Sequence, residues 1–253
     1  VANYLHNAIQ VVDLDKRQPV RKIALGKDVE MTAARRGEVI FHDAQRSLDQ
    51  WYSCHSCHYE GGINSERMDT FNDGTAFTFK TVLPLYGLVE TAPWTWHGWQ
   101  QDLDAAMRKS ITSTMLGAEP SQQDVGDLLA YVKTLQEPPN PYRQLDGSLS
   151  PAAERGRTVF LSPQAGCASC HKGPYFTDGK IHDLGLGEEK DKYQGFNTPT
   201  LRGVYRKVRL LHHGRAKSLQ QVLTEYHAPQ DVAGSGKLTD QQLADLIAYL
   251  KSL

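Results

Sequence analysis

The pattern Cys-x-x-Cys-His occurs twice in this chain, at residues 54–58 and 167–171. It is the attachment pattern of c-type haem. The two thiols form thioethers with the haem vinyl groups, and the adjacent histidine binds the iron. The sequence therefore predicts two covalently bound haem c groups. The predicted attachment residues and proximal ligands are Cys54, Cys57, His58, Cys167, Cys170 and His171.

All four cysteines lie in these two motifs, so zinc sites or disulfides are the alternative. A four-cysteine zinc site usually has about 15–20 residues between its two Cys-x-x-Cys halves. Here the gap runs from Cys57 to Cys167, and no further ligands stand at zinc-finger spacing. A histidine directly after the second cysteine, in both motifs, is what haem requires. The pattern favours haem over zinc.

Composition excludes several other classes of protein. The 253 residues carry a formal net charge of −1, which gives no reason to expect nucleic acid as a partner. No apolar run approaches 18 residues, so no transmembrane segment is expected. Haem is attached to Cys-x-x-Cys-His outside the cytoplasm. We therefore expect a periplasmic or other extracytoplasmic location, with a leader sequence removed.

The two halves resemble each other well beyond the haem motifs. Each half ends in a segment with apolar residues at i, i+3, i+4 and i+7, which predicts an amphipathic helix. These segments are residues 124–135 and 241–253, and Ser121 and Thr239 are their predicted N-caps. Other matched segments are 33–37 with 152–156, 79–81 with 196–198, and 97–98 with 213–214. The repeat predicts a mainly α protein of two haem domains in a pseudo-twofold arrangement.

The N-terminal segment belongs to neither repeat. Residues 8–14 and 20–25 are short β-type runs around a polar turn, which predicts a short hairpin. It resembles the last strands of a β-propeller blade, and the alternative is a hairpin packed on the haem domains. The predicted domains are the hairpin at 1–28, haem domain 1 at 29–136, a proline-rich linker at 137–151, and haem domain 2 at 152–253.

A family resemblance emerges in the second half. The segments that carry it, in order, are 167–178, 182–187, 197–204, 212–215 and 218–219. They resemble the bacterial diheme cytochrome c peroxidases, including the methylamine-utilisation diheme enzymes, and the resemblance covers about residues 30–253. It implies two cytochrome c-like domains, in which one haem relays electrons and the other opens a site for peroxide.

The resemblance implies an oxidoreductase that reduces hydrogen peroxide or oxidises a protein substrate, with a small redox protein as electron donor or acceptor. Two alternatives stay open. One is a pure electron-transfer cytochrome in which both irons have six ligands. The other is the haem domain of a longer, propeller-fused enzyme.

The sixth ligand of the first haem decides which function applies, because it sets access to the iron and its potential. Met115 stands just before the closing helix, where simple cytochromes c place their methionine ligand, and His97 is the alternative. Counting from Trp96, Met115 falls near the catalytic glutamate of the peroxidases. Glu119 is four residues further on and is the remaining candidate for that acid–base role.

The second haem cannot take a methionine of its own half as sixth ligand, since no methionine follows His171. In the family its sixth ligand is Met, or Tyr in the methylamine-utilisation type. The corresponding position here is Tyr226, with His227 beside it. His227, Tyr226 and an open coordination position are the three possibilities.

The resemblance also suggests residues between the two haems. Trp96 matches the tryptophan that bridges the haems in the family, and Trp94 and Trp99 compete for that role. His212 matches a family histidine, whereas His213, like His97, stands where the family has an aspartate. Either His212 or His213 is a candidate donor to peroxide. The family's interdomain Ca2+ is not expected here, because the matching segment, 207–209, carries two cations. The backbone of 173–174 is expected to hold the His171 ring.

Overall fold

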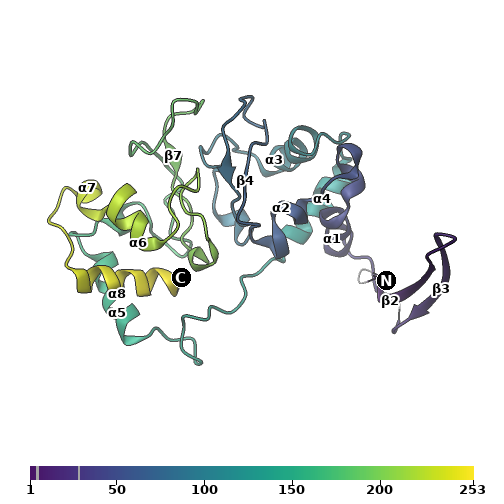
Figure 1. Ribbon diagram of the computed structural model, residues 1–253, viewed down its shortest axis with the longest axis horizontal. Helices are drawn as coiled ribbons and strands as arrows, with labels where there is room; N and C mark the ends of the chain where they lie inside the picture. The colour runs from purple at the N-terminus through teal and green to yellow at the C-terminus, as the bar shows by residue number, and fades with distance from the viewer. Residues whose placement is uncertain (4–5, 28) are drawn as a thin grey trace.

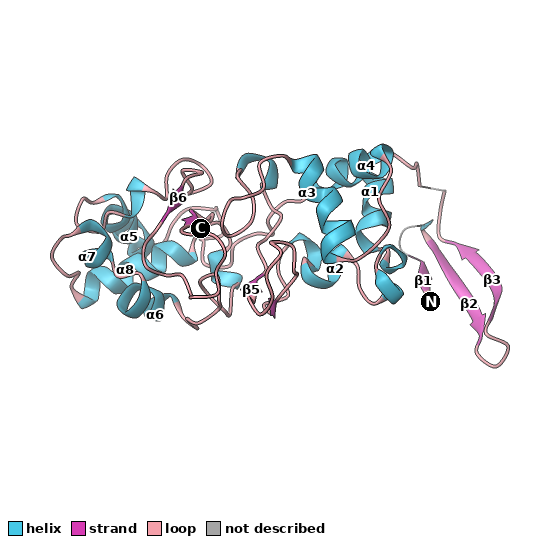
Figure 2. Ribbon diagram, turned by 90° about the horizontal axis from the view of Figure 1, so that it is seen from above, coloured by secondary structure: helices cyan, strands magenta, loops and turns pink. Residues whose placement is uncertain are grey.

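The computed structural model describes residues 1–3, 6–27 and 29–253. Two helical halves lie along the long axis of an elongated molecule, and a small β-sheet projects beyond the first half (Figures 1 and 2). Residues 4, 5 and 28 of the predicted N-terminal segment lie outside the described residues. No helix in the described part of the chain is long and apolar enough to cross a bilayer.

Helices dominate both halves, which confirms the predicted mainly α fold. The first half contains α1 (Ala33–His42), α2 (Cys54–Cys57), α3 (Leu103–Lys109) and α4 (Gln122–Val132). The second contains α5 (Pro151–Leu161), α6 (Leu219–Gln221), α7 (Pro229–Ala233) and α8 (Asp240–Lys251). A π-helical turn follows α3 over Ser110–Thr114 and α6 over Val222–Tyr226. Short 3-10 turns cover Ala44–Arg46, Leu48–Gln50, Tyr59–Gly61, Leu88–Glu90, Cys167–Ser169 and Val204–Arg206.

The closing helices α4 and α8 begin where the sequence predicts caps. Ser121 and Thr239 each accept a hydrogen bond from the backbone amide three residues later. The residue at that position returns a side-chain bond, so both caps are capping boxes. Both helices end earlier than predicted, at Val132 and Lys251.

The strands are short and antiparallel. At the N-terminus, β1 (Ala2–Asn3), β2 (Ala8–Asp13) and β3 (Gln18–Ala24) form one sheet in that order, with Ile9 opposite Ile23. This confirms the predicted hairpin, although every residue of β3 is exposed. In the halves, β4 (Arg67–Met68) pairs with β5 (Lys80–Thr81), and β6 (Ile181–His182) pairs with β7 (Phe196–Asn197).

One helix crossing occurs in the same way in both halves. In the first, α1 crosses α4 at Gly37, where an added Cβ would lie 1.9 Å from the Asp127 carbonyl oxygen. Beside this contact, Arg36 donates two hydrogen bonds of 2.7 Å to the Asp127 carboxylate. The bidentate pair fixes the crossing angle that the glycine permits.

The second half repeats the crossing between α5 and α8. A Cβ at Gly156 would also lie 1.9 Å from a backbone oxygen, that of Asp245. Arg155 donates bonds of 2.8 and 2.7 Å to the Asp245 carboxylate. Phe41 in the first half and Phe160 in the second are almost completely buried in the core beside the crossing. Each half therefore has its own core with the same frame.

Backbone hydrogen bonds join the two halves. The Thr81 amide donates to the His212 carbonyl at 2.7 Å, and the Asn197 amide donates to the Trp96 carbonyl at 2.8 Å. Thr81, in β5 of the first half, thus binds the segment that bears His212. Asn197, in β7 of the second half, binds the segment that bears Trp96. These bonds fix where Trp96 and His212 lie between the halves.

Gly37→Ala should destabilise the protein, because the obstructing atom is backbone and cannot rotate away. We expect the free energy of unfolding to fall by about 1–3 kcal/mol, the usual cost of overpacking. Gly126→Ala on α4 is the matched control, since nothing lies within 4 Å of its added Cβ. It should be neutral or stabilise by up to about 1 kcal/mol. Urea unfolding of the haem-loaded protein measures both, and equal effects would contradict the proposed close contact.

Candidate haem sites and the interface between them

The first Cys-x-x-Cys-His motif lies at the wall of a cavity in the first half. Helix α2 carries Cys54 and Cys57 one turn apart, which puts both thiols on one face, and His58 ends the helix. Ser53 and Ser56 form a capping box at its start, so this single turn is held at its N-terminus. The same cavity is lined by Met68, Asn72, Trp96, His97, Thr114 and Met115.

The second motif lies in an equivalent cavity in the other half. Cys167 begins the 3-10 turn Cys167–Ser169, and Cys170 and His171 follow it. The other residues that line this cavity include Trp96, His182, Phe196, Lys207, His212 and His227.

The four cysteines are available to form thioethers with haem. All four are free thiols. Burial raises the pKa of Cys54 and of Cys167 to about 11, so both are neutral at pH 7. The residues present therefore fit covalent haem c.

Both proximal histidines are neutral, as ligation to iron requires. Burial lowers the pKa of His58 and of His171 to about 4. In His171, Nδ1 lies 2.9 Å from the Phe176 carbonyl oxygen, which fixes Nδ1 as the protonated nitrogen and leaves the Nε2 lone pair for iron. This corrects the prediction that the backbone of residues 173–174 holds the ring. The chain turns back after His171, and the later carbonyl reaches it.

Trp96 lines both cavities. Its indole Nε1–H donates to the Thr81 carbonyl at 2.7 Å, and the side chain is buried. The His212 ring meets it edge-on, with centroids 6.1 Å apart. The two competing tryptophans differ from it, because Trp99 lines the first cavity alone and Trp94 lines neither cavity.

Two methionine sulfurs approach the first motif. The Met115 Sδ atom lies 4.0 Å from the Cys54 Sγ atom, and its side chain is 4% exposed. The Met68 Sδ atom lies 3.1 Å from the Cys57 Sγ atom. The fold therefore brings Met115 to the cavity from 57 residues beyond His58, and it adds Met68 as a residue that sequence spacing alone did not favour.

Of the two candidates for the second cavity, the fold brings only His227 to its wall. His227 is close enough to His171 to lower the pKa of that ring electrostatically. Tyr226 is not among the described lining residues. Its ring packs near the core and lies 5.7 Å from the Arg215 guanidinium.

Glu119 lies outside both cavities. Its carboxylate binds Arg108 at 2.9 Å, and its side chain is 65% exposed. Arg108 also binds Asp104 and the Pro120 carbonyl, so Glu119 belongs to a surface cluster around the start of α4. The structure does not bring this carboxylate towards the haem motif.

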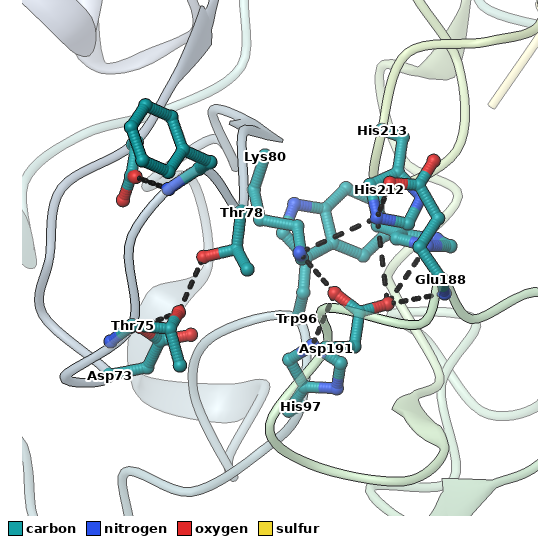
Figure 3. A network of polar contacts seen from close by, with 12 residues as sticks. Asp73, Thr75, Thr78, Lys80, Trp96, His97, Glu188, Asp191, His212 and His213 are labelled. Atoms are coloured by element: carbon teal, nitrogen blue, oxygen red, sulfur yellow. Dashed lines mark hydrogen bonds and ion pairs between the residues drawn. The ribbon is translucent and has the colours of Figure 1, made fainter.

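Asp191 stands at the centre of a polar network between the halves (Figure 3). Lys80 Nζ donates to Asp191 Oδ1 at 2.5 Å, and His213 Nε2 lies 3.5 Å from Asp191 Oδ2. Burial raises the pKa of Asp191, but hydrogen bonds from Lys80 and from the Glu188 amide lower it further than burial raises it. The carboxylate is therefore ionised, and the Lys80 ammonium balances its charge.

Two other histidines face Asp191 without bonding to it. His97 Nε2 and His212 Nε2 lie 3.8 and 3.9 Å from its carboxylate, and neither atom has a hydrogen-bond partner among the described residues. His97 is oriented by Nδ1, which is 2.8 Å from the Gly195 carbonyl oxygen. Burial lowers the pKa of His212 to about 2, so this ring is neutral.

Comparisons with known proteins show which proteins this chain resembles. The cytochrome c family model matches residues 153–253. The chain is 28% identical to hydrazine synthase subunit gamma of Kuenenia stuttgartiensis over 271 residues, covering 87% of this chain and 77% of that protein. It is 24% identical to the methylamine utilization protein MauG of Methylorubrum extorquens, covering 86% and 76%.

Solved structures with a similar fold superpose on most of this chain. Hydrazine synthase from Kuenenia stuttgartiensis, studied under xenon pressure, superposes with a TM-score of 0.76 at 25% identity, covering 90% of this chain and 89% of that chain. The diheme peroxidase BthA from Burkholderia thailandensis superposes with a TM-score of 0.64 at 16% identity, covering 90% and 87%, which shows a shared fold.

The second half of the chain contains a cytochrome c domain, and together with the homologues this implies covalently bound haem c. Its homologues include MauG proteins and diheme cytochrome c peroxidases, and this similarity supports a diheme peroxidase-like oxidoreductase. These relatives give no support to the resemblance between the N-terminal hairpin and a propeller blade.

Sequence reasoning missed Lys80 and Asp191. Asp191 stands in the charged run 188–192, which has the composition of a solvated loop. A signal was present, however. His97 and His213 both stand where the family that the sequence resembles has an aspartate, so neither position supplies an acid to the interface. The structure supplies one acid, Asp191, from a different segment.

Lys80→Met should weaken the association of the two halves, because it leaves a buried carboxylate without its cation. Removing one partner of a buried ion pair typically costs about 3–5 kcal/mol. The matched control is Arg157→Met, which breaks a pair with Glu154 in which both side chains are more than half exposed. That change should cost less than about 1 kcal/mol. Urea unfolding of both haem-loaded variants tests the comparison, and equal losses would contradict a buried pair at Asp191.

Proposed function

We propose that this chain holds one haem c in each cavity and acts as a periplasmic diheme oxidoreductase in which Trp96 carries electrons between the two sites. A single observation supports the electron path: Trp96 lines both cavities. The Thr81 carbonyl holds its indole N–H, so the ring is fixed between the two sites. When bound, each haem supplies one-electron redox chemistry at its iron.

The proximal side is the same in both sites of this proposal. His58 and His171 bind the irons through neutral imidazoles, and the four cysteines hold the porphyrins. The distal sides differ. Met115 is the proposed sixth ligand in the first cavity, and His227 is the proposed sixth ligand in the second.

The proposed substrate is hydrogen peroxide, which would be reduced, or a protein side chain, which would be oxidised. Peroxide reduction needs a group that exchanges protons beside the substrate. We assign this role to His212 in preference to Glu119. His212 lines the second cavity, is neutral, and has a buried Nε2 without a described partner, whereas Glu119 is on the surface with Arg108.

A second candidate function is electron transfer without substrate chemistry. The observation that favours it is that each cavity contains a residue able to close the sixth position, Met115 in one and His227 in the other. Both irons would then have six ligands in every redox state. In the peroxidase function one sixth ligand would leave its iron so that substrate can bind, whereas in the electron-transfer function both sixth ligands would stay.

For either function we propose a small redox protein as electron donor or acceptor. Hydrazine synthase subunit gamma is, by its name, one subunit of a larger enzyme. A stable protein partner is therefore a further possibility that copurification from the native source would reveal.

The choice between enzyme and electron carrier is tested with optical and EPR spectra of the oxidised and half-reduced protein, before and after peroxide. We expect a high-spin haem in the half-reduced protein that reacts with peroxide. Two haems that stay low-spin and inert in every redox state would leave only electron transfer.

In the same experiment, Trp96→Phe should slow electron exchange between the haems at least tenfold. Trp51→Phe, at a tryptophan that is 81% exposed, is its control and should not change the rate.

The proposed sixth ligands have separate spectroscopic tests. Oxidised His/Met haem has a weak far-red charge-transfer band, which Met115→Ala should abolish and Met68→Ala should leave. His227→Ala should convert the second haem to high spin, whereas Tyr226→Phe should not. If the band survives without Met115, or if Tyr226→Phe is the change that alters the second haem, the assignment is wrong.

A further inference from the structure

Lys207 is a cation in the wall of the second haem cavity. It follows the turn Val204–Arg206 and is half-buried. Its side chain lines the second cavity and also a neighbouring cavity whose walls include Tyr86 and Pro138. The Nζ atom lies 5.6 Å from the ring centroid of Trp96. Lys207 therefore contacts the electron path that we propose.

The ammonium has no anionic partner in the described structure. No described carboxylate lies within 4.0 Å of Nζ, and the residues that line the second cavity include no Asp or Glu. The neighbouring cavity has one acid in its lining, Glu60, but the Glu60 carboxylate is 72% exposed and pairs with His55. The neighbouring charge is Arg206, which repels Lys207. Lys80, by comparison, binds Asp191 directly.

An unpaired cation in this environment is costly unless something compensates it. Lysine is almost never buried without a partner, because its charge loses hydration. Burial and Arg206 lower the pKa of Lys207 to about 8, so the ammonium is still mostly charged at pH 7. A cavity with one unpaired cation in its wall fits an anionic occupant. Haem carries two propionate carboxylates, and the attachment residues of the second site line this same cavity.

We propose that Lys207 Nζ pairs with a propionate of the haem in the second cavity and places a fixed positive charge beside Trp96. This inference rests on the proposed second haem. The charge stabilises the ferrous state of that haem and so raises its reduction potential. It also opposes removal of an electron from Trp96, because a cation next to the indole disfavours a second positive charge on the ring. Lys207 is thus a positioning and tuning residue that does not itself react.

The test is a potentiometric titration of the holoprotein followed by optical and EPR spectra, which separate the two haems. Lys207→Met removes the charge and keeps the length of the side chain. The reduction equilibrium constant of the second haem should fall about tenfold or more, which is 59 mV or more for one electron. The first haem should change less. Lys207→Arg retains the charge and should stay within about threefold of the native constant.

Lys237→Met is the matched control, because it makes the same change in net charge at an exposed lysine. It should change neither potential. If Lys207→Met and Lys237→Met shift the second haem equally, or if neither shifts it, the proposal is overturned.

A second measurement applies if the Lys207→Met variant does not incorporate haem. Propionate-bending modes in the resonance Raman spectrum respond to hydrogen bonds on the propionates. They should differ between the native protein and Lys207→Arg, because the donor geometry changes, and should be unchanged in Lys237→Met. Identical modes in Lys207→Arg would overturn the pairing. A pyridine haemochrome assay that finds one haem per chain would instead overturn the proposed function.

Discussion

The site between the halves depends on two backbone hydrogen bonds, from Thr81 to His212 and from Asn197 to Trp96. They join short strands of one half to a loop of the other, and backbone bonds hold position more strictly than side-chain contacts do. Trp96 lies against both cavities because of them. The buried pair of Lys80 and Asp191 supports the same interface, and its charge is balanced locally. Without this register, the chain would be two separate cytochrome c-like units.

The two halves share a frame but differ where the chemistry takes place. The crossings at Gly37 and Gly156 have the same geometry, and so do the arginine–aspartate pairs beside them. A close helix contact tolerates little change, because any side chain at the glycine would strike backbone. The distal walls are under no such constraint. One presents Met115 and the other His227, and the function that we propose depends on that difference.

Much of the fold was predictable because it is encoded in local patterns. The haem motifs, the amphipathic closing helices and the caps at Ser121 and Thr239 depend on residues only a few positions apart. The predictions were weakest where distant segments meet. Glu119 seemed available from its position in the chain, yet Arg108 holds it at the surface. The ring of His171 binds the Phe176 carbonyl in place of the backbone at 173–174, because the path of the loop decides which carbonyl arrives.

The sequence by itself determined the cofactor chemistry and the duplication. A thiol pair and an adjacent histidine within five residues predict covalent haem from the local sequence alone. Only the tertiary structure decided which residues share each cavity. It put Trp96 in both, Lys207 without an anion beside it, and Asp191 among three histidines from two loops. Those relations involve residues about 20–110 positions apart, and burial gives them their energy. No local sequence pattern records which distant residues meet or how deeply they are buried.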